Sequence, residues 1–235
     1  MILQRFVTDV FSENCYVVAD EEHRQAVVVD PGGGIAATVL RALEESGLEL
    51  GAVLLTHGHP DHVWDAAEVA GDLPVYVAEP DLYRLEDPVG PPSPLSNTMR
   101  QAFPTPYRRP LDVRVLPDAL LAGGGAELVP GVSIRALAAP GHTEGSTLYF
   151  LAGEWSDAVS SAAGAPAGTT GLVLCGDVVF RGSVGRTDLP GGDHEVMLWT
   201  LRTLKQVIDP AAMLFPGHGP GTTMAQELRH NPFLA

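Results

Sequence analysis

Short apolar runs alternate with amphipathic stretches along most of the chain. The runs at 15–19, 25–30 and 52–55 have the length and composition of buried strands. Apolar residues recur at helical spacing over 35–46 and over 194–208. Further strands are expected at 2–10, 74–77, 113–116, 126–129, 132–138, 146–151, 171–175 and 212–215, and further helices at 62–70 and 222–230. Because the second half repeats the strand–helix rhythm of the first, we predict two sheets face to face with helices outside, in one domain over 1–235.

Two stretches interrupt this rhythm. Residues 81–110 contain seven prolines, so this Pro-rich excursion cannot form a regular strand or a long helix. It either covers a site or is a surface excursion, and the pattern leaves both interpretations open. Residues 153–170 are small and weakly patterned, which predicts a flexible hairpin loop.

The charge and the cysteine content indicate which partners and which cellular compartment to expect. With 14 basic and 29 acidic residues the chain carries a net charge of −15, which disfavours nucleic acid and anionic membranes as partners. No signal peptide is visible, and no apolar run reaches the roughly 18 residues of a membrane span. Cys15 and Cys175 lie in strand-like contexts and are expected to be buried, reduced thiols. We therefore expect a cytoplasmic protein.

The stretch 51–64, GAVLLTHGHPDHVW, is the most informative part of the chain. An apolar strand leads directly into His57, His59, Asp61 and His62. Imidazoles and carboxylates at this density are the ligands that zinc and similar metals accept, whereas a polar cluster at a helix start does not need three histidines. The spacing predicts a metal site, and the two adjacent pairs suit two metals better than one.

Three other turns carry a potential ligand beside glycine. Each follows a short apolar strand, and they hold His142, Asp177 and His218. Since strand ends often meet along one edge of a sheet, these side chains are expected to join the first four. His23, His194 and His230 lie outside these motifs and are assigned no role.

Together, THGHPDH (56–62), PGHTEGS (140–146), CGD (175–177) and PGHG (216–219) resemble the motifs of the metallo-β-lactamase-fold hydrolases. The segments ENCYVV, VVVDPGG, GSVGRTDLPGGDH and RHNPFL are similar to those of the single-domain glyoxalase-II-like branch, the hydroxyacylglutathione hydrolases. This resemblance implies an α/β (α+β) fold, the four-layer αββα sandwich. It also implies one metal bound by His57, His59 and His142, a second bound by Asp61, His62 and His218, and Asp177 as the bridge between them.

The resemblance further implies hydrolysis of a small-molecule thioester of the S-acylglutathione type. The nucleophile would be a hydroxide held between two divalent metals, zinc first and iron or manganese as alternatives. Asp61 would both bind metal and orient that hydroxide. By position, Arg186 matches a lysine that contacts glutathione in two-domain glyoxalase II enzymes, and Arg181 lies in the same loop. The alternative for Arg186 is that it only ties down its own loop through Asp188.

Other functions remain open from the sequence. A persulfide dioxygenase has the same fold and binds one iron at positions that correspond to His57, His142 and Asp177. A hydrolase of another ester, lactone or thioester would use the same ligands. A metal-free interaction protein is disfavoured because the complete ligand set is present.

Overall fold

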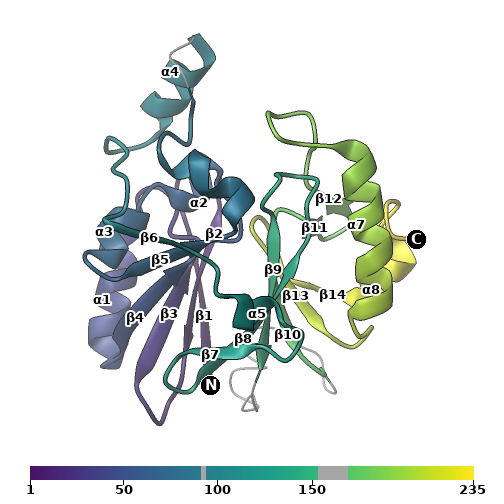
Figure 1. Cartoon of the computed structure of the whole chain (residues 1–235), viewed down its shortest axis with the longest axis horizontal. Helices are drawn as coiled ribbons and strands as arrows, with labels where there is room; N and C mark the ends of the chain where they lie inside the picture. Colours follow the sequence, from purple (N-terminus) through teal and green to yellow (C-terminus); the bar gives the residue numbers. More distant parts are fainter. Residues whose placement is uncertain (91–93, 153–168) are drawn as a thin grey trace.

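The computed structural model describes residues 1–90, 94–152 and 169–235. In this part of the chain two mixed six-stranded sheets face each other (Figure 1). The first sheet has the order β1 (Ile2–Val7), β2 (Asn14–Ala19), β3 (Gln25–Val29), β4 (Glu49–Leu54), β5 (Pro74–Val77), β6 (Asp112–Val115). The second has the order β14 (Thr222–Thr223), β13 (Met213–Pro216), β10 (Leu172–Gly176), β9 (Thr147–Ala152), β8 (Val132–Ala138), β7 (Ala126–Val129). A small hairpin joins β11 (Val179–Phe180) to β12 (Ser183–Val184).

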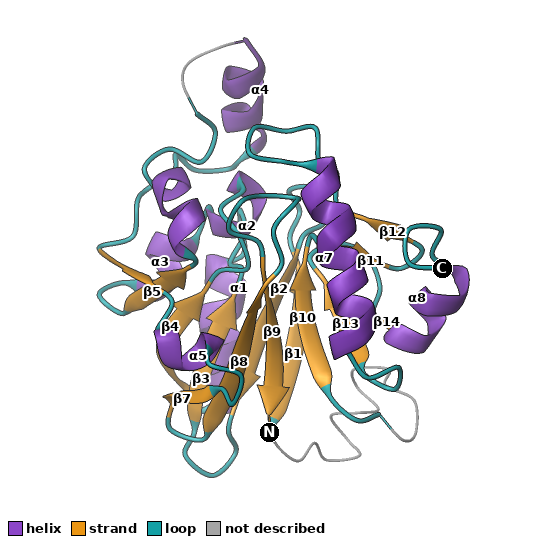
Figure 2. Ribbon diagram, turned by 45° about the vertical axis from the view of Figure 1, so that its right-hand side comes forward, coloured by secondary structure: helices purple, strands orange, loops and turns teal. Residues whose placement is uncertain are grey.

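Helices cover the outer face of each sheet (Figures 1 and 2). The helices are α1 (Ala36–Ser46), α2 (Pro60–Val63), α3 (Ala66–Ala70), the 3₁₀ helix η1 (Glu79–Leu85), α4 (Pro94–Ala102), α5 (Asp118–Leu121), α7 (His194–Val207) and α8 (Met224–His230). Helices α1 and α3 pack on the first sheet, and α7 and α8 pack on the second. The predicted order of helices, sheet, sheet and helices is confirmed.

Side-chain alternation along the strands separates the layers. In β10, Leu172 and Leu174 point into the core between the two sheets, while Val173 and Cys175 point toward α7. Because residues two apart share a face of a strand, one short apolar run supplies two cores. Each fully buried leucine contributes roughly 1.5–3 kcal/mol to folding.

The prediction of one continuous helix over 62–70 is wrong. Two short helices, α2 and α3, replace it, and α2 begins at Pro60. The chain breaks because the amide of Asp65 donates to the carbonyl of Pro31 rather than to a residue one turn earlier, at 3.0 Å. The Asp65 carboxylate in turn accepts from the amide of Ala36 at the start of α1, at 2.9 Å. Helix periodicity alone did not reveal this tertiary contact.

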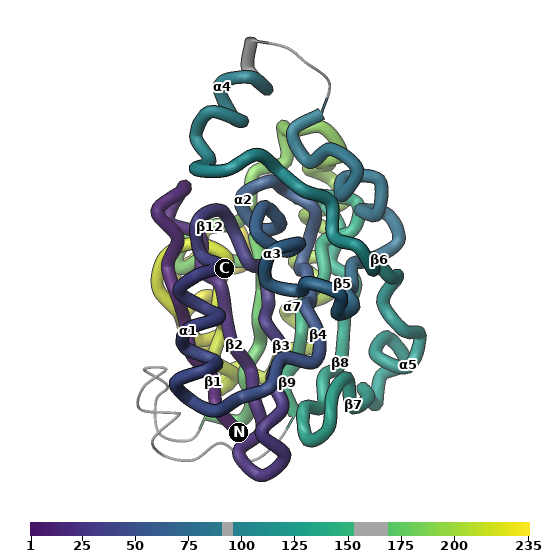
Figure 3. Tube along the Cα trace, turned by 90° about the vertical axis from the view of Figure 1, so that its left-hand side faces the viewer, coloured from purple at the N-terminus to yellow at the C-terminus, as the bar shows by residue number. Residues whose placement is uncertain are grey.

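The Pro-rich excursion contains local helix and has two separate parts. Its first part, within η1, contacts the metal-ligand motif through Asp81 and Arg84. Its second part includes α4, which stands apart from the sheets in Figures 1 and 3, and Phe103, whose ring stacks on Trp64 at 3.7 Å. The predicted loop at 153–170 lies almost entirely outside the described residues. Among the described helices, none has both the length and the apolar character that a membrane crossing requires.

Candidate metal centre

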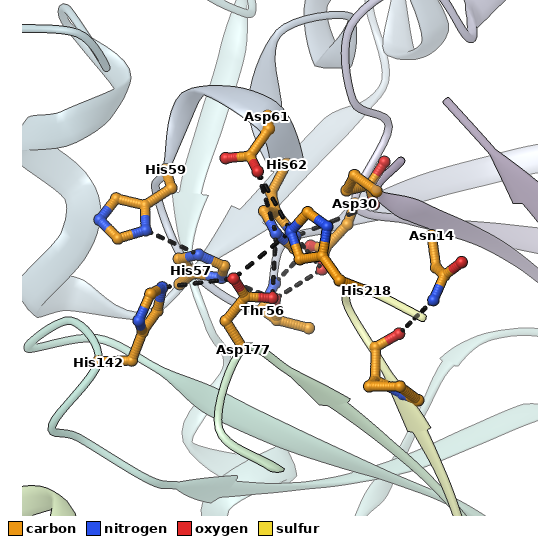
Figure 4. A network of polar contacts seen from close by, with 12 residues as sticks. Asn14, Asp30, Thr56, His57, His59, Asp61, His62, His142, Asp177 and His218 are labelled. Atoms are coloured by element: carbon orange, nitrogen blue, oxygen red, sulfur yellow. Dashed lines mark hydrogen bonds and ion pairs between the residues drawn. The ribbon is translucent and has the colours of Figure 1, made fainter. Parts of the chain in front are cut away.

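The side chains that the sequence singles out converge at one end of the sandwich (Figure 4). β4 leads into the turn that carries the HxHxDH motif, while β8, β10 and β13 of the other sheet each lead into one further turn. The side chains that meet are His57, His59, Asp61, His62, His142, Asp177 and His218. They therefore lie at strand ends, as the sequence predicted, and they come from both sheets.

Three histidines form the first group. Nε2 of His57 lies 3.1 Å from Nδ1 of His59. The ring of His142 lies 4.8 Å from the ring of His57 and 4.5 Å from that of His59, between ring centres. All three side chains are buried. Their spacing allows one ligand atom from each to reach a shared cation.

Asp61, His62 and His218 form the second group. Nε2 of His218 lies 3.2 Å from Oδ2 of Asp61, and Nε2 of His62 lies 4.0 Å from the same oxygen. His62 is fully buried, while His218 is partly open to solvent. The second group is therefore the more accessible side of the centre.

Asp177 lies between the two groups. Its Oδ2 is 3.6 Å from Nε2 of His142 in the first group and 3.5 Å from Nε2 of His218 in the second. Its Oδ1 is 3.3 Å from Nε2 of His62. A single carboxylate thus faces both groups.

Hydrogen bonds at the far side of the rings fix which nitrogen faces the centre. Nδ1 of His142 donates to the carbonyl of Arg186 at 2.8 Å, and Nδ1 of His218 donates to the carbonyl of Phe11 at 3.1 Å. A carbonyl can only accept, so these Nδ1 atoms carry a proton, and Nε2 is the ring nitrogen that faces the centre. Outer partners of this kind orient metal-binding histidines.

Asp30 fixes two further histidines. Its Oδ2 accepts from Nδ1 of His62 at 3.0 Å and from the hydroxyl of Thr56 at 2.6 Å. Because the Thr56 hydrogen points to Asp30, its oxygen accepts from Nδ1 of His57 at 3.1 Å. The rings of His62 and His57 therefore both present Nε2 to the centre.

Several polar atoms at the centre are buried without a hydrogen bond from any described residue. These atoms are Nε2 of His62, Nε2 of His142 and Oδ1 of Asp177. Buried polar atoms rarely stay unpartnered, because each costs about 1–3 kcal/mol. Five imidazoles and two carboxylates are moreover a donor set that divalent transition metals accept. The residues present fit a divalent metal.

Electrostatics favour the ligating forms in the first group. Burial lowers the pKa of His57, lowers that of His59 to about 3 and lowers that of His142. These imidazoles are therefore neutral at pH 7, which is the form that binds metal.

The two carboxylates of the centre are ionised. Burial opposes ionisation of Asp177, but the neighbouring His62, His218 and His142 hold its pKa below the usual value. Burial also opposes ionisation of Asp61, but the contact with His218 outweighs it and holds the pKa of Asp61 below its usual value. Together they supply negative charge where cations would sit.

The two arginines proposed for substrate lie near the centre but differ in their contacts. The Arg186 guanidinium is exposed and donates twice to Asp188, from Nε to Oδ1 and from Nη2 to Oδ2, each at 2.7 Å. Its backbone carbonyl holds His142. Arg181 follows Phe180, whose ring centre lies 6.1 Å from that of His218. The loop between Asp177 and α7 thus borders both groups.

Sequence reasoning assigned no role to Asp30, Thr56, Asn14 or Asp81. All four are buried polar residues that contact the ligands or the loops that carry them. Asp30 could have been singled out from the sequence, because it ends a buried strand directly before Pro31. Asp81 could not, because it starts the Pro-rich excursion.

The family model described as "Metallo-beta-lactamase superfamily" matches residues 8–154, which is more than half of the chain. The chain belongs to this superfamily. The two facing sheets with helices outside are its fold, and the centre described above occupies the strand ends. The chain is accordingly a metallo-hydrolase superfamily member with a divalent metal site.

Three relatives within the superfamily cover nearly the whole chain. The hydroxyacylglutathione hydrolase GloC of Haemophilus influenzae is 33% identical, over 95% of this chain and 93% of the relative. The crystal structure of the BLEG-1 B3 metallo-beta-lactamase is 28% identical with a TM-score of 0.77, covering 100% of both chains. The crystal structure of TTHA1623 in a di-iron-bound form is 32% identical with a TM-score of 0.71, covering 98% of this chain and 100% of the other.

Proposed function

We propose that the protein hydrolyses a thioester of the S-acylglutathione type at a dinuclear metal centre. The observation that carries this proposal is Asp177, whose oxygens face His142 of the first group and both His62 and His218 of the second. A carboxylate in that position suits two cations that share it. The relative named hydroxyacylglutathione hydrolase, at 33% identity over nearly full length, supports the substrate class.

Each of the two proposed cations has its own set of candidate ligands. Bound divalent cations supply a hydroxide at neutral pH and polarise the carbonyl of the substrate. His57, His59 and His142 would hold one cation, Asp61, His62 and His218 the other, and Asp177 both. Zinc is our first choice for both ions; the di-iron form of TTHA1623 supports iron as an alternative, and manganese is the third.

Asp61 is the proposed catalytic residue beyond its role as a ligand. One of its oxygens, Oδ2, contacts His218, and the carboxylate is partly open to solvent, unlike His62 beside it. The other oxygen is therefore available to accept a hydrogen bond from the attacking hydroxide and orient it. A thiolate leaves readily without a dedicated acid, which suits a centre that consists of ligands.

The substrate anion requires local positive charge, because the chain as a whole carries −15. Arg186 and Arg181 are the proposed contacts, since they lie on the loop that follows Asp177. Use of Arg186 would exchange its bond to Asp188 for one to a substrate carboxylate. Small thioesters, rather than nucleic acid or membranes, are the proposed partners.

We place this reaction in the cytoplasm, where glutathione is abundant and thiols stay reduced. The burial of Cys15 and Cys175 as free thiols fits that compartment. Fractionation of the source cells with an antibody against the chain would test the location; recovery outside the cytoplasmic fraction would contradict it.

A parallel assay of hydrolysis and oxygen consumption tests the reaction class. The purified protein should cleave S-lactoylglutathione without oxygen uptake, and glutathione persulfide in air should give little uptake. Strong uptake with negligible thioester cleavage would instead identify a persulfide dioxygenase. Cleavage of a lactone or a simple ester in preference to the glutathione thioester would reassign the substrate while retaining the hydrolase.

A further inference from the structure

We propose that Asn14 and Asp81 are positioning residues, Asn14 for the turn that carries His218 and Asp81 for the backbone beside His57, His59 and His142. The proposal rests on the dinuclear centre proposed above. It concerns two buried side chains outside the ligand set, one in β2 and one in η1. Neither is a ligand, so each would act through the loops that it holds.

Asn14 holds the loop that carries His218. Its side-chain Nδ2 donates to the carbonyls of Pro216 and Gly219, both at 2.9 Å, and its backbone amide donates to the carbonyl of Gly217 at 2.7 Å. The hydroxyl of Tyr16 adds a second donor to Pro216 at 2.7 Å. Every non-ligand residue of the PGHG turn is therefore bound by β2.

This contact crosses the sandwich. Asn14 and Tyr16 belong to the first sheet, whereas the turn leaves β13 of the second. The ring of His218 contacts Oδ2 of Asp61 through Nε2 and donates from Nδ1 to the carbonyl of Phe11. The position of His218 relative to Asp61 and His62, which the first sheet supplies, thus depends on donors from β2.

Asp81 holds both loops of the first group. Its Oδ2 accepts from the amide of Gly58 at 2.7 Å and from the hydroxyl of Thr143 at 2.8 Å. Its Oδ1 accepts from the amide of Gly145 at 2.9 Å and from Nε of Arg84 at 3.3 Å. Gly58 lies between His57 and His59, and Thr143 follows His142. One fully buried carboxylate therefore fixes the spacing of these three histidines.

Asn14 and Asp81 hold different backbone groups, although the loop that Asp81 holds at Gly58 continues into Asp61 and His62 of the second group. The Asn14 side chain donates to the turn of His218, whereas the Asp81 carboxylate accepts from Gly58, Thr143 and Gly145 beside the histidines of the first group and from Arg84. A general loss of stability would weaken both metals together. A positioning role instead predicts that each variant weakens one metal more than the other, because partners of ligands tune affinity locally.

Metal titration of near-isosteric variants tests this selectivity. Metal-free wild-type protein, Asn14→Asp and Asp81→Asn would be titrated with Zn²⁺ against a chromophoric chelator. Asn14→Asp removes both side-chain donors, and Asp81→Asn removes the charge and half of the acceptors. Each should weaken one zinc by about 10–100-fold and weaken the other to a smaller degree.

Two ligand variants identify which site is affected. In a His62→Ala background, where the first group alone binds, Asp81→Asn should weaken the remaining zinc more than Asn14→Asp does. In a His59→Ala background the order should reverse. Equal weakening of both zinc ions by either variant, or no weakening by either, would overturn the positioning roles.

Failure of the dinuclear centre gives a different result. Wild-type protein that binds a single zinc would contradict the proposed function itself, whatever the variants do. If Asn14→Asp or Asp81→Asn does not fold, judged by far-ultraviolet circular dichroism, milder variants are available: Tyr16→Phe removes the bond to Pro216, and Thr143→Val removes the bonds to Asp81 and Ser146. They should weaken the same zinc ions in the same pattern, to a smaller degree.

Discussion

Asp30 accepts a hydrogen bond from Nδ1 of His62 at 3.0 Å, and both side chains are buried. The same carboxylate reaches His57 through Thr56 and so orients one ligand in each group. Asp30→Ala should therefore lower the affinity for both metals, by about 10–100-fold each. Thr56→Val, which removes only the His57 branch, should affect one metal more than the other. Unchanged zinc affinity in folded Asp30→Ala protein would contradict this assignment.

Gly217 touches the centre so closely that no side chain fits. A Cβ atom there would lie 2.2 Å from Oδ1 of Asp177 and 2.6 Å from Cε1 of His62. Gly217→Ala should displace one of these side chains and reduce metal content and activity together. Gly124→Ala is the matched control, because no atom lies within 4 Å of the added Cβ. Full metal content in Gly217→Ala would contradict this prediction, because it would show that the turn can shift away from Asp177 and His62 without loss of metal affinity.

Arg186 offers a test of substrate contact through its partner. If the guanidinium binds a substrate carboxylate, Arg186→Ala should raise KM for S-lactoylglutathione roughly tenfold, with kcat less affected. Asp188→Ala should lower KM, because it frees Arg186 from its present bond. Should both variants keep the wild-type KM with intact metal content, Arg186 serves only its own loop.

Both thiols should be inert in the native protein. Burial raises the pKa of Cys175 to about 12 and raises that of Cys15 well above its ordinary value. A thiol is protonated below its pKa, so at pH 8 Cys175 remains in the unreactive thiol form. A disulfide reagent such as Ellman's should label neither thiol in native protein and both after denaturation. Rapid native labelling would show that a strand core opens.

Local patterns were sufficient for most of the fold and for the residues that converge at the centre. The strand over 132–138 and the helix from 194 coincide with β8 and α7, because hydrophobic period and burial agree there. The residues of the centre were recognisable because histidine and aspartate cluster directly after predicted strands, with four of them within residues 57–62. Helix 62–70 was mispredicted because Asp65 bonds to Pro31 and to Ala36, which are distant in sequence.

The residues that hold the loops of the candidate ligands could not be predicted from the sequence in the same way. Asp81 and Asn14 act through backbone groups of loops more than 20 residues away, and backbone amides and carbonyls leave no mark on the sequence. Nor could the pairing of Arg186 with Asp188 be distinguished from substrate binding, since both use the same charge. Those distinctions depend on three-dimensional contacts.

The metal content of the purified protein tests the dinuclear centre most directly. Elemental analysis of protein purified without added metal should give close to two equivalents of divalent metal per chain. Asp177→Ala should lower both, because Asp177 faces His142 on one side and His62 and His218 on the other. His62→Ala should remove mainly one. A firm value of one equivalent in the wild type, present as iron, would contradict the account.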